Sequence, residues 1–170
     1  MFNGKLYDVE RRVVRPDDAV RYVRATGEVT FNGVGVPLRI MVYADVDRMK
    51  WINDNLGHEE GDAALIEAAT VLKETFREAD IIGRVGGDEF AVLATETGSE
   101  VALGDLTLLL KERLTKITAG HNAASGRKYQ LSMSIGVKRC GPGCCHSVNE
   151  LLNQADQLMY EDKRQRGVGR

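Results

Sequence analysis

Two apolar runs flank a pair of glycines near the middle of the chain, and this pattern constrains the fold of the chain more than any other feature. Ile81-Ile82 precede Gly86-Gly87, and residues 90–93 continue the apolar run on the other side. Apolar runs separated by a short glycine-containing segment predict two strands joined by a tight turn. The turn also holds Asp88 and Glu89. Adjacent carboxylates repel each other unless a cation or a basic group offsets them, so this tip is either a solvated acidic turn or a binding site.

A second acidic strand end lies upstream and favours the binding site. Residues 38–46 are almost continuously apolar, which predicts a buried, central strand. This run ends in Asp45-Val46-Asp47. Carboxylates at the end of a buried strand lie where an open sheet presents its ligands. We therefore expect the two acidic segments to be close together in the fold.

Three amphipathic helices are predicted in the same region. The first begins at Gly61-Asp62, the second covers about residues 100–118 and stops at Gly120, and the third begins at Ser147, where residues 147–150 match a capping box. Their predicted inward-facing residues are Leu65, Ala68, Ala69, Leu72 and Phe76, then Leu103, Leu106, Leu109, Leu110, Leu114 and Ile117, then Leu151, Leu152, Ala155, Leu158 and Met159.

The remaining segments complete the expected architecture. Residues 131–137 alternate apolar and small polar side chains, which predicts a strand with one buried face. Residues 1–27 are interpreted as an N-terminal, linker-like arm with a short helix after Pro16-Asp17-Asp18. Residues 29–31 and Val34 flank Asn32-Gly33, which predicts a hairpin whose returning strand is residues 38–46. The order of elements predicts an α+β fold with a mostly antiparallel central sheet flanked by helices, in a domain covering residues 28–170.

Composition excludes several classes of protein. The chain of 170 residues is 43% hydrophobic and 28% charged with a net charge of −2, which gives no indication of a nucleic-acid or membrane surface. We expect no membrane span and no signal peptide. Cys140, Cys144 and Cys145 are an odd, clustered set, which favours a reducing, cytoplasmic setting. With His146 they offer four zinc ligands, but these lie so close in sequence that we favour a loop of reduced thiols over a metal site.

Four separated motifs, in the same order and spacing, resemble the GGDEF family of diguanylate cyclases. They are residues 45–54 (DVDRMKWIND), Gly57-His58, Gly61-Asp62 and Gly86-Gly87-Asp88-Glu89-Phe90, within a similarity that covers about residues 38–163. The resemblance implies a fold like the palm of nucleotide cyclases and polymerases. It also implies condensation of two GTP molecules into cyclic di-GMP, with release of pyrophosphate, by a homodimer controlled by a sensor or regulatory domain outside this chain.

The resemblance also implies roles for individual residues. Asp45, Asp88 and the Val46 carbonyl correspond to ligands of Mg²⁺ or Mn²⁺, and Glu89 to the residue that helps to deprotonate the attacking hydroxyl, so the catalytic set is Asp45, Asp88 and Glu89. Mg²⁺ is a hard cation that takes one or two carboxylates together with phosphates. The implied substrate-binding residues are Asn53 and Asp62 at the guanine edge, Lys163 at the terminal phosphates, and Met49, Lys50, His58, Gly86 and Gly87 around them. Arg77 and Asp80 correspond to a site where the product inhibits the enzyme.

Each of these residues also has a purely structural interpretation. Asn53 would suit a turn, Asp62 a helix cap and Lys163 a solvated last helical turn. Arg77 and Asp80 would equally suit a helix end followed by a turn.

The sequence departs from the family pattern at three places, and two of them, at the start of the chain and at the C-terminal arginine, keep a second function open. The usual opening motif is not recognisable in residues 1–37, Met49 replaces a common phenylalanine, and Gly167 stands where an arginine is usual, with Arg166 one place earlier. The alternative is a non-catalytic module that binds GTP or cyclic di-GMP and signals to a partner domain. The intact Gly86-Gly87-Asp88-Glu89-Phe90 favours catalysis.

Overall fold

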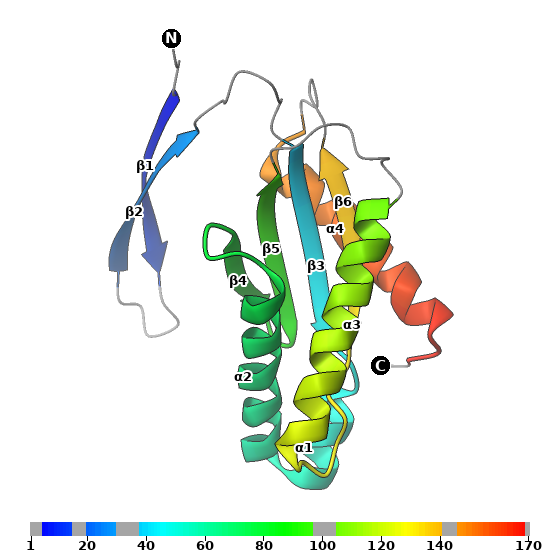
Figure 1. The fold of residues 1–170 in the computed structure, drawn as a ribbon. Coiled ribbons are helices and arrows are strands. Elements are labelled where there is room, and N and C mark those ends of the chain that lie inside the picture. The colour runs from blue at the N-terminus through cyan, green and yellow to red at the C-terminus, as the bar shows by residue number, and fades with distance from the viewer. Residues whose placement is uncertain (1–4, 15–19, 30–37, 97–104, 141–145, 169–170) are drawn as a thin grey trace. The chain divides into compact units, whose positions relative to one another are not determined.

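The structure is a computed structural model that describes residues 5–14, 20–29, 38–96, 105–140 and 146–168 (Figure 1). The chain divides into two compact units, Met1–Val36 and Pro37–Arg170, and each is described here by itself.

The first unit is a two-stranded antiparallel hairpin. β1 (Lys5–Val14) pairs with β2 (Val20–Val29), from Lys5 opposite Val29 to Val14 opposite Val20. The helix expected after Pro16 is therefore wrong over its described part, because residues 20–29 form β2. β-Branched and aromatic residues recur through this segment and favour a strand over a helix. Asn32-Gly33 lies outside the described residues.

The second unit has the order strand, two helices, hairpin, helix, strand, helix. Its elements are β3 (Leu38–Val46), α1 (Met49–Leu56), α2 (His58–Thr75), β4 (Ile81–Gly86), β5 (Glu89–Glu96), α3 (Asp105–Ser125), β6 (Met133–Cys140) and α4 (Val148–Gln165). The strand order is β4-β5-β3-β6, and every pair is antiparallel. The expected α+β class, the central position of β3 and the β4–β5 hairpin are confirmed. β5 and β6 are the two neighbours of β3, and Val29, which we expected to lead into a hairpin with this strand, pairs with Lys5 instead.

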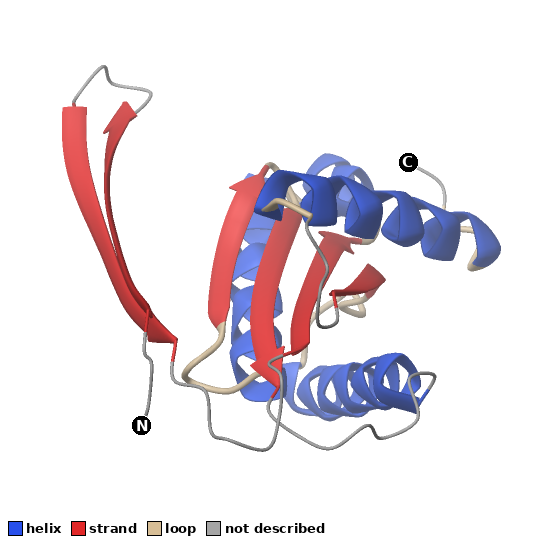
Figure 2. Ribbon diagram, turned by 90° about the horizontal axis from the view of Figure 1, so that it is seen from above, coloured by secondary structure: helices blue, strands red, loops and turns tan. Residues whose placement is uncertain are grey.

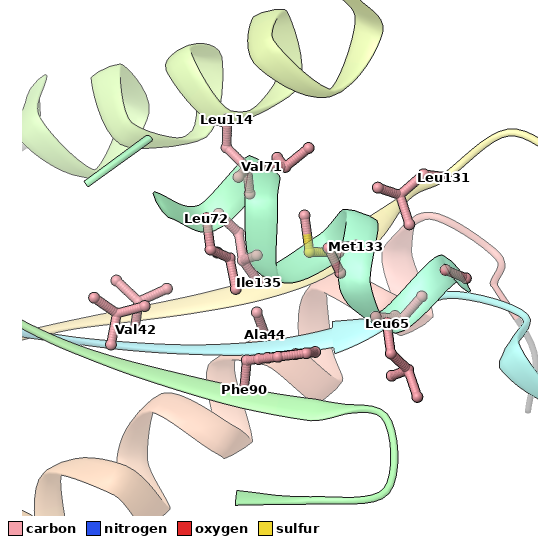
Figure 3. Packing of buried hydrophobic residues seen from close by; sticks show 14 of the residues in the cluster. Val42, Ala44, Leu65, Val71, Leu72, Phe90, Leu114, Leu131, Met133 and Ile135 are labelled. Atoms are coloured by element: carbon pink, nitrogen blue, oxygen red, sulfur yellow. The ribbon is translucent and has the colours of Figure 1, made fainter. Parts of the chain in front are cut away.

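Helices cover both faces of this sheet (Figure 2). On one face, even-numbered β3 residues such as Val42 and Ala44 pack with Phe90 of β5 and with α2 and α3, where Leu72 and Leu114 are buried (Figure 3). Successive side chains of β3 point to opposite faces of the sheet, so Met41 and Tyr43 lie on the other face. There they pack with residues that include Leu151, Leu152 and Ala155 of α4.

Both faces of β6 are buried, so the expectation that residues 131–137 bury only one face is wrong. Ser134 and Gly136 are buried as well as Met133, Ile135 and Val137, because α4 packs directly on β6. A Cβ atom on Gly136 would lie 1.9 Å from the Ala155 carbonyl oxygen of α4. Only a residue without a side chain permits so close an approach of the two backbones.

The helix boundaries differ from those expected in ways that local signals explain. α2 begins at His58, ahead of Gly61, and α3 continues past Gly120 to end before Gly126, whose φ of 62° suits a helix stop. The capping box at Ser147 is confirmed by bonds in both directions with Glu150.

The predicted inward-facing residues are mostly confirmed. Of α2, Leu65, Ala68 and Leu72 are buried, and Ala69 and Phe76 pack against the core. Leu114, Leu110 and Ile117 of α3 do the same. Leu109 of α3 is 53% exposed and Leu158 of α4 is 38% exposed, so the prediction is wrong for these two residues. Leu103 and the side chain of Leu106 lie outside the described part.

Candidate active site

The end of β3 and the tip of the β4–β5 hairpin meet, as the sequence predicts. Asp45 lies directly opposite Glu89 in the β3–β5 ladder. The next amide, Val46 N, donates to the Asp88 carbonyl at 3.0 Å. The hairpin loop contains only Gly87 and Asp88, since Gly86 pairs with Glu89, and the φ of 24° at Gly87 favours glycine. Backbone pairing alone therefore brings the two acidic segments together.

A pocket of about 580 Å³ opens at this junction. Seven of the residues that the resemblance assigns to metal or substrate line it, namely Asp45, Val46, Met49, Lys50, Asp88, Glu89 and Lys163. They come from β3, α1, the hairpin and α4, so the site is assembled from distant parts of the second unit.

Asp45 is the most enclosed acid of this pocket. It is 7% exposed, and its Oδ1 accepts a hydrogen bond from Lys163 Nζ at 2.5 Å. Burial raises the pKa of Asp45, and the charges of Asp88 and Asp47 add to the rise, while Lys163 acts in the opposite direction. The local field thus favours a positive charge beside Asp45, and Lys163 supplies one.

The oxygen atoms at the junction fit a small hard cation. Asp45 and Asp88 offer two carboxylates whose charges interact, and the carbonyl of Val46 adds a neutral oxygen at the same strand end. Within residues 38–96, 105–140 and 146–168 no cluster of three or more His, Cys, Asp or Glu side chains could enclose an ion. Two carboxylates without a full protein cage suit Mg²⁺, which usually keeps waters or substrate phosphates in its shell.

Glu89 has a partner that the sequence did not reveal. The Tyr43 hydroxyl interacts with the Glu89 carboxylate, and burial, followed by the charge of Glu89, raises the pKa of Tyr43 to about 12. Tyr43 precedes Asp45 by two residues, so both side chains leave the same face of β3. That period-two spacing is the signal that could have identified it. Gly86 also lies close to the Glu89 carboxylate, because a Cβ at Gly86 would be 3.2 Å from Glu89 Oε2.

The two residues assigned to the guanine edge lie on consecutive helices. Asn53 is on α1 and half-buried, whereas Asp62 is on α2 and exposed, near the exposed His58 that begins this helix. Asn53 Oδ1 occupies the space where a Cβ of Gly61 would stand, only 1.9 Å from that position. None of these residues lines the pocket at Asp45, so the base-reading role stays a prediction.

Arg77 and Asp80 lie together in the turn between α2 and β4. The Arg77 amide donates to Asp80 Oδ2 at 2.8 Å, and the Asp80 amide donates to the Arg77 carbonyl at 3.0 Å. These bonds give the aspartate a turn-forming role, and neither residue lines the pocket. A product site here stays a prediction.

Four further residues line the pocket that the sequence analysis did not single out. They are Arg48, Trp51, Asp54 and Asn55. Arg48, Trp51 and Asn55 are spaced three and four residues apart, which places them on one side of α1. They were missed because α1 was not predicted: its N-cap residue is Arg48, whose φ is 60° and whose side chain makes no capping hydrogen bond.

The cysteine cluster requires a correction. Cys140 ends β6, is 1% exposed and is disulfide-bonded, so the expectation of a reduced thiol is wrong at this position. Cys144 and Cys145 lie outside the described residues.

The antiparallel sheet with helices on both faces and a two-carboxylate pocket at its central strand end are those of the palm-like α+β class. The family model described as "Diguanylate cyclase, GGDEF domain" matches residues 37–168. The chain therefore belongs to the GGDEF family, as the motifs indicated.

Individual relatives agree with this assignment. The chain is 34% identical over 125 residues to diguanylate cyclase TpbB of Pseudomonas aeruginosa, and 35% over 124 residues to the probable diguanylate cyclase DgcC of Escherichia coli. These matches cover 74% and 73% of this chain but only 28% and 32% of the relatives, so the chain spans about a third or less of their length. The crystal structure of the GGDEF domain of TpbB, also named YfiN, superposes with a TM-score of 0.60 at 35% identity and covers 75% of this chain and 77% of that one.

Among the described residues, no helix combines the length and the apolar composition that a membrane crossing requires.

Proposed function

We propose that this chain is a diguanylate cyclase domain that condenses two GTP molecules into cyclic di-GMP and releases two pyrophosphates. The observation that carries the proposal is the pairing of Asp45 with Glu89 beside Asp88 and Lys163 in one pocket. Carboxylates for a cation, a cation for phosphate and a carboxylate for a proton are what phosphoryl transfer to a hydroxyl requires.

Each residue of the pocket has a separate role in this reaction. Asp45, Asp88 and the Val46 carbonyl hold Mg²⁺ or Mn²⁺, which when bound neutralises charge on the phosphates. Lys163 and Lys50 line the same pocket and pair with the triphosphate oxygens. The 3′-oxygen of one GTP bonds to the α-phosphorus of the other, the bond to the pyrophosphate breaks, and Glu89 accepts the hydroxyl proton. Tyr43 interacts with the Glu89 carboxylate and helps to position it.

Base selection belongs to the α1–α2 region in this proposal. Guanine presents N–H donors where adenine presents an acceptor, so an acceptor-only carboxylate at Asp62 suits GTP. Asn53 offers a donor and an acceptor, and Gly61 leaves the space that its amide occupies.

The proposal extends to partners and control. Each subunit supplies one GTP, so two copies of the chain face each other during catalysis, and a regulatory domain outside this chain sets the rate. We place the reaction in the cytoplasm, where GTP is available. Product inhibition at Arg77 and Asp80 is a separate part of the proposal: added cyclic di-GMP should slow the enzyme, and Arg77→Ala should relieve the inhibition without raising the GTP requirement. An unchanged wild-type rate in added product would exclude that part.

The deciding experiment incubates the purified chain with GTP and Mg²⁺ and identifies the nucleotide products by chromatography and mass spectrometry. Cyclic di-GMP and pyrophosphate are expected, with a rate that rises more than linearly with protein concentration. Asp88→Asn is the matched inactive control, because it removes one cation ligand at nearly constant shape. GTP binding without any dinucleotide would favour the non-catalytic binding module instead.

A further inference from the structure

A buried carboxylate next to the pocket has no part in the chemistry described so far. The Asp47 side chain is 0% exposed. Its Oδ1 accepts from Ser134 Oγ at 2.6 Å, and its Oδ2 accepts from Ser132 Oγ at 2.7 Å. A buried charge needs a counter-charge in addition to hydrogen bonds. Arg166 supplies it, with the guanidinium nitrogen Nη1 3.1 Å from Asp47 Oδ2.

Arg166 is directed toward the sheet by two further contacts. The same nitrogen donates to the Met133 carbonyl at 2.7 Å and lies 3.4 Å from Ser134 Oγ. Arg166 does not line the pocket, whereas Lys163 does. The arginine is one place earlier than in the family pattern, and this offset explains why its side chain points to the sheet. Arg166 keeps a right-handed helical backbone, whereas Gly167, with φ of 65°, ends the helix.

The last turn of α4 is fastened to the sheet at a second residue as well. Asp162 Oδ2 accepts from the Ile135 amide of β6 at 3.2 Å, and its Oδ1 pairs with Lys111 of α3 at 2.6 Å. Asp162 and Arg166 are four residues apart, so both lie on the side of α4 that faces β6. Lys163 lies between them in sequence and reaches Asp45.

We propose that Asp47 and Arg166 form a clamp that positions Lys163 toward Asp45, and that Arg166 is a positioning residue and not a contact to the triphosphate. The clamp joins the end of β3 to the end of α4, which are the two elements that carry Asp45 and Lys163. The positioning stands on the unliganded geometry, and only the consequence for nucleotide affinity rests on the proposed function.

The primary test uses no nucleotide. Thermal unfolding of the full chain is measured for Asp45→Asn, Lys163→Met and the double variant, and the deviation from additivity reports the Asp45–Lys163 pairing. We expect a deviation of about 2 °C or more in the wild-type background and none in the Arg166→Met background. Arg164→Met removes the same charge from an exposed neighbour and should leave the deviation intact. Arg166→Lys replaces Arg166→Met where the latter does not fold. A deviation that survives without Arg166, or that is absent in the wild type, overturns the proposal.

A second measurement separates positioning from direct contact. Affinity for 3′-deoxyguanosine triphosphate, which lacks the attacking hydroxyl, is measured with Mg²⁺. Arg166→Met should weaken binding about tenfold, and should add nothing in the Lys163→Met background. Full additivity of the two losses would mean that Arg166 contacts phosphate itself and would overturn the proposal. Failure of the wild type to bind this nucleotide counts against the proposed function, and the unfolding measurements then decide the clamp alone.

Discussion

Gly136→Ala is the sharpest perturbation of the contact between β6 and α4. The added Cβ would lie 1.9 Å from the Ala155 carbonyl oxygen and 2.3 Å from the Met159 amide nitrogen, both backbone atoms. Ordinary contact begins near 3.4 Å, so α4 would have to move by about 1.5 Å. Overpacking of this kind costs about 1–3 kcal/mol, and each kcal/mol lowers the Tm of a domain this size by roughly 2–4 °C.

The displacement should also reach the pocket, because α4 carries Lys163. We therefore expect Gly136→Ala to lower both the urea midpoint, followed by circular dichroism, and the rate of cyclic di-GMP formation at a temperature where the variant is still folded.

Gly120→Ala is the matched control for this variant. Gly120 is exposed within α3, and a Cβ there meets nothing within 4 Å. Replacing a glycine inside a helix by alanine should stabilise the protein by about 0.5–1 kcal/mol, so the same chemical change has opposite signs at the two sites. If Gly136→Ala unfolds at the same urea concentration as the wild type, α4 does not pack on β6 as described.

Three further predictions concern the pocket. Glu89→Gln should lower the rate about 10²–10⁴-fold, measured as dinucleotide formed, while affinity for 3′-deoxyguanosine triphosphate is kept; near-normal turnover would reject Glu89 as the proton acceptor. Lys163→Met should raise the affinity of the nucleotide-free protein for Mn²⁺, measured by electron paramagnetic resonance, because Lys163 competes for Asp45, and should weaken nucleotide binding; two changes of the same sign would contradict this. Asp62→Ser should narrow the preference for GTP over ATP in a competition assay that scores cyclic di-GMP, the mixed dinucleotide and cyclic di-AMP; unchanged selectivity would leave Asp62 as a helix-start residue only.

The parts of the fold that the sequence predicted are those fixed by local pattern. The continuous apolar run of residues 38–46 and the glycine pair of the β4–β5 hairpin each have one sensible interpretation. The end of α3 has two, because Gly120 and Gly126 could each end the helix, and only the φ of 62° at Gly126 distinguishes them. The second buried face of β6 could not be predicted, since it depends on packing against α4 rather than on any property of the strand itself.

In the candidate site, too, the residues that the sequence predicted are those in local motifs. Asp45, Asp88 and Glu89 were predicted because they belong to short motifs whose spacing can be read from the sequence. Asp47 was visible but unexplained, because its partners Ser132, Ser134 and Arg166 are 85 or more residues away, and no local pattern pairs them. The sequence showed only that Arg166 is one place before the position of the usual arginine, whereas its bonds to Asp47 and Met133 direct it toward the sheet.

The bond between Lys163 and Asp45 has a consequence for how the protein becomes active as it is made. The two residues are 118 positions apart, one in the first strand of the second unit and the other in its last helix. A chain emerging from the ribosome can form the sheet pairing of β3 with β5, and so bring both acidic segments together, well before α4 has been synthesised. Lys163 is supplied only with the last turn of α4, so a nascent or prematurely terminated chain presents the carboxylates without the lysine. Competence for nucleotide is thereby tied to completion of the domain.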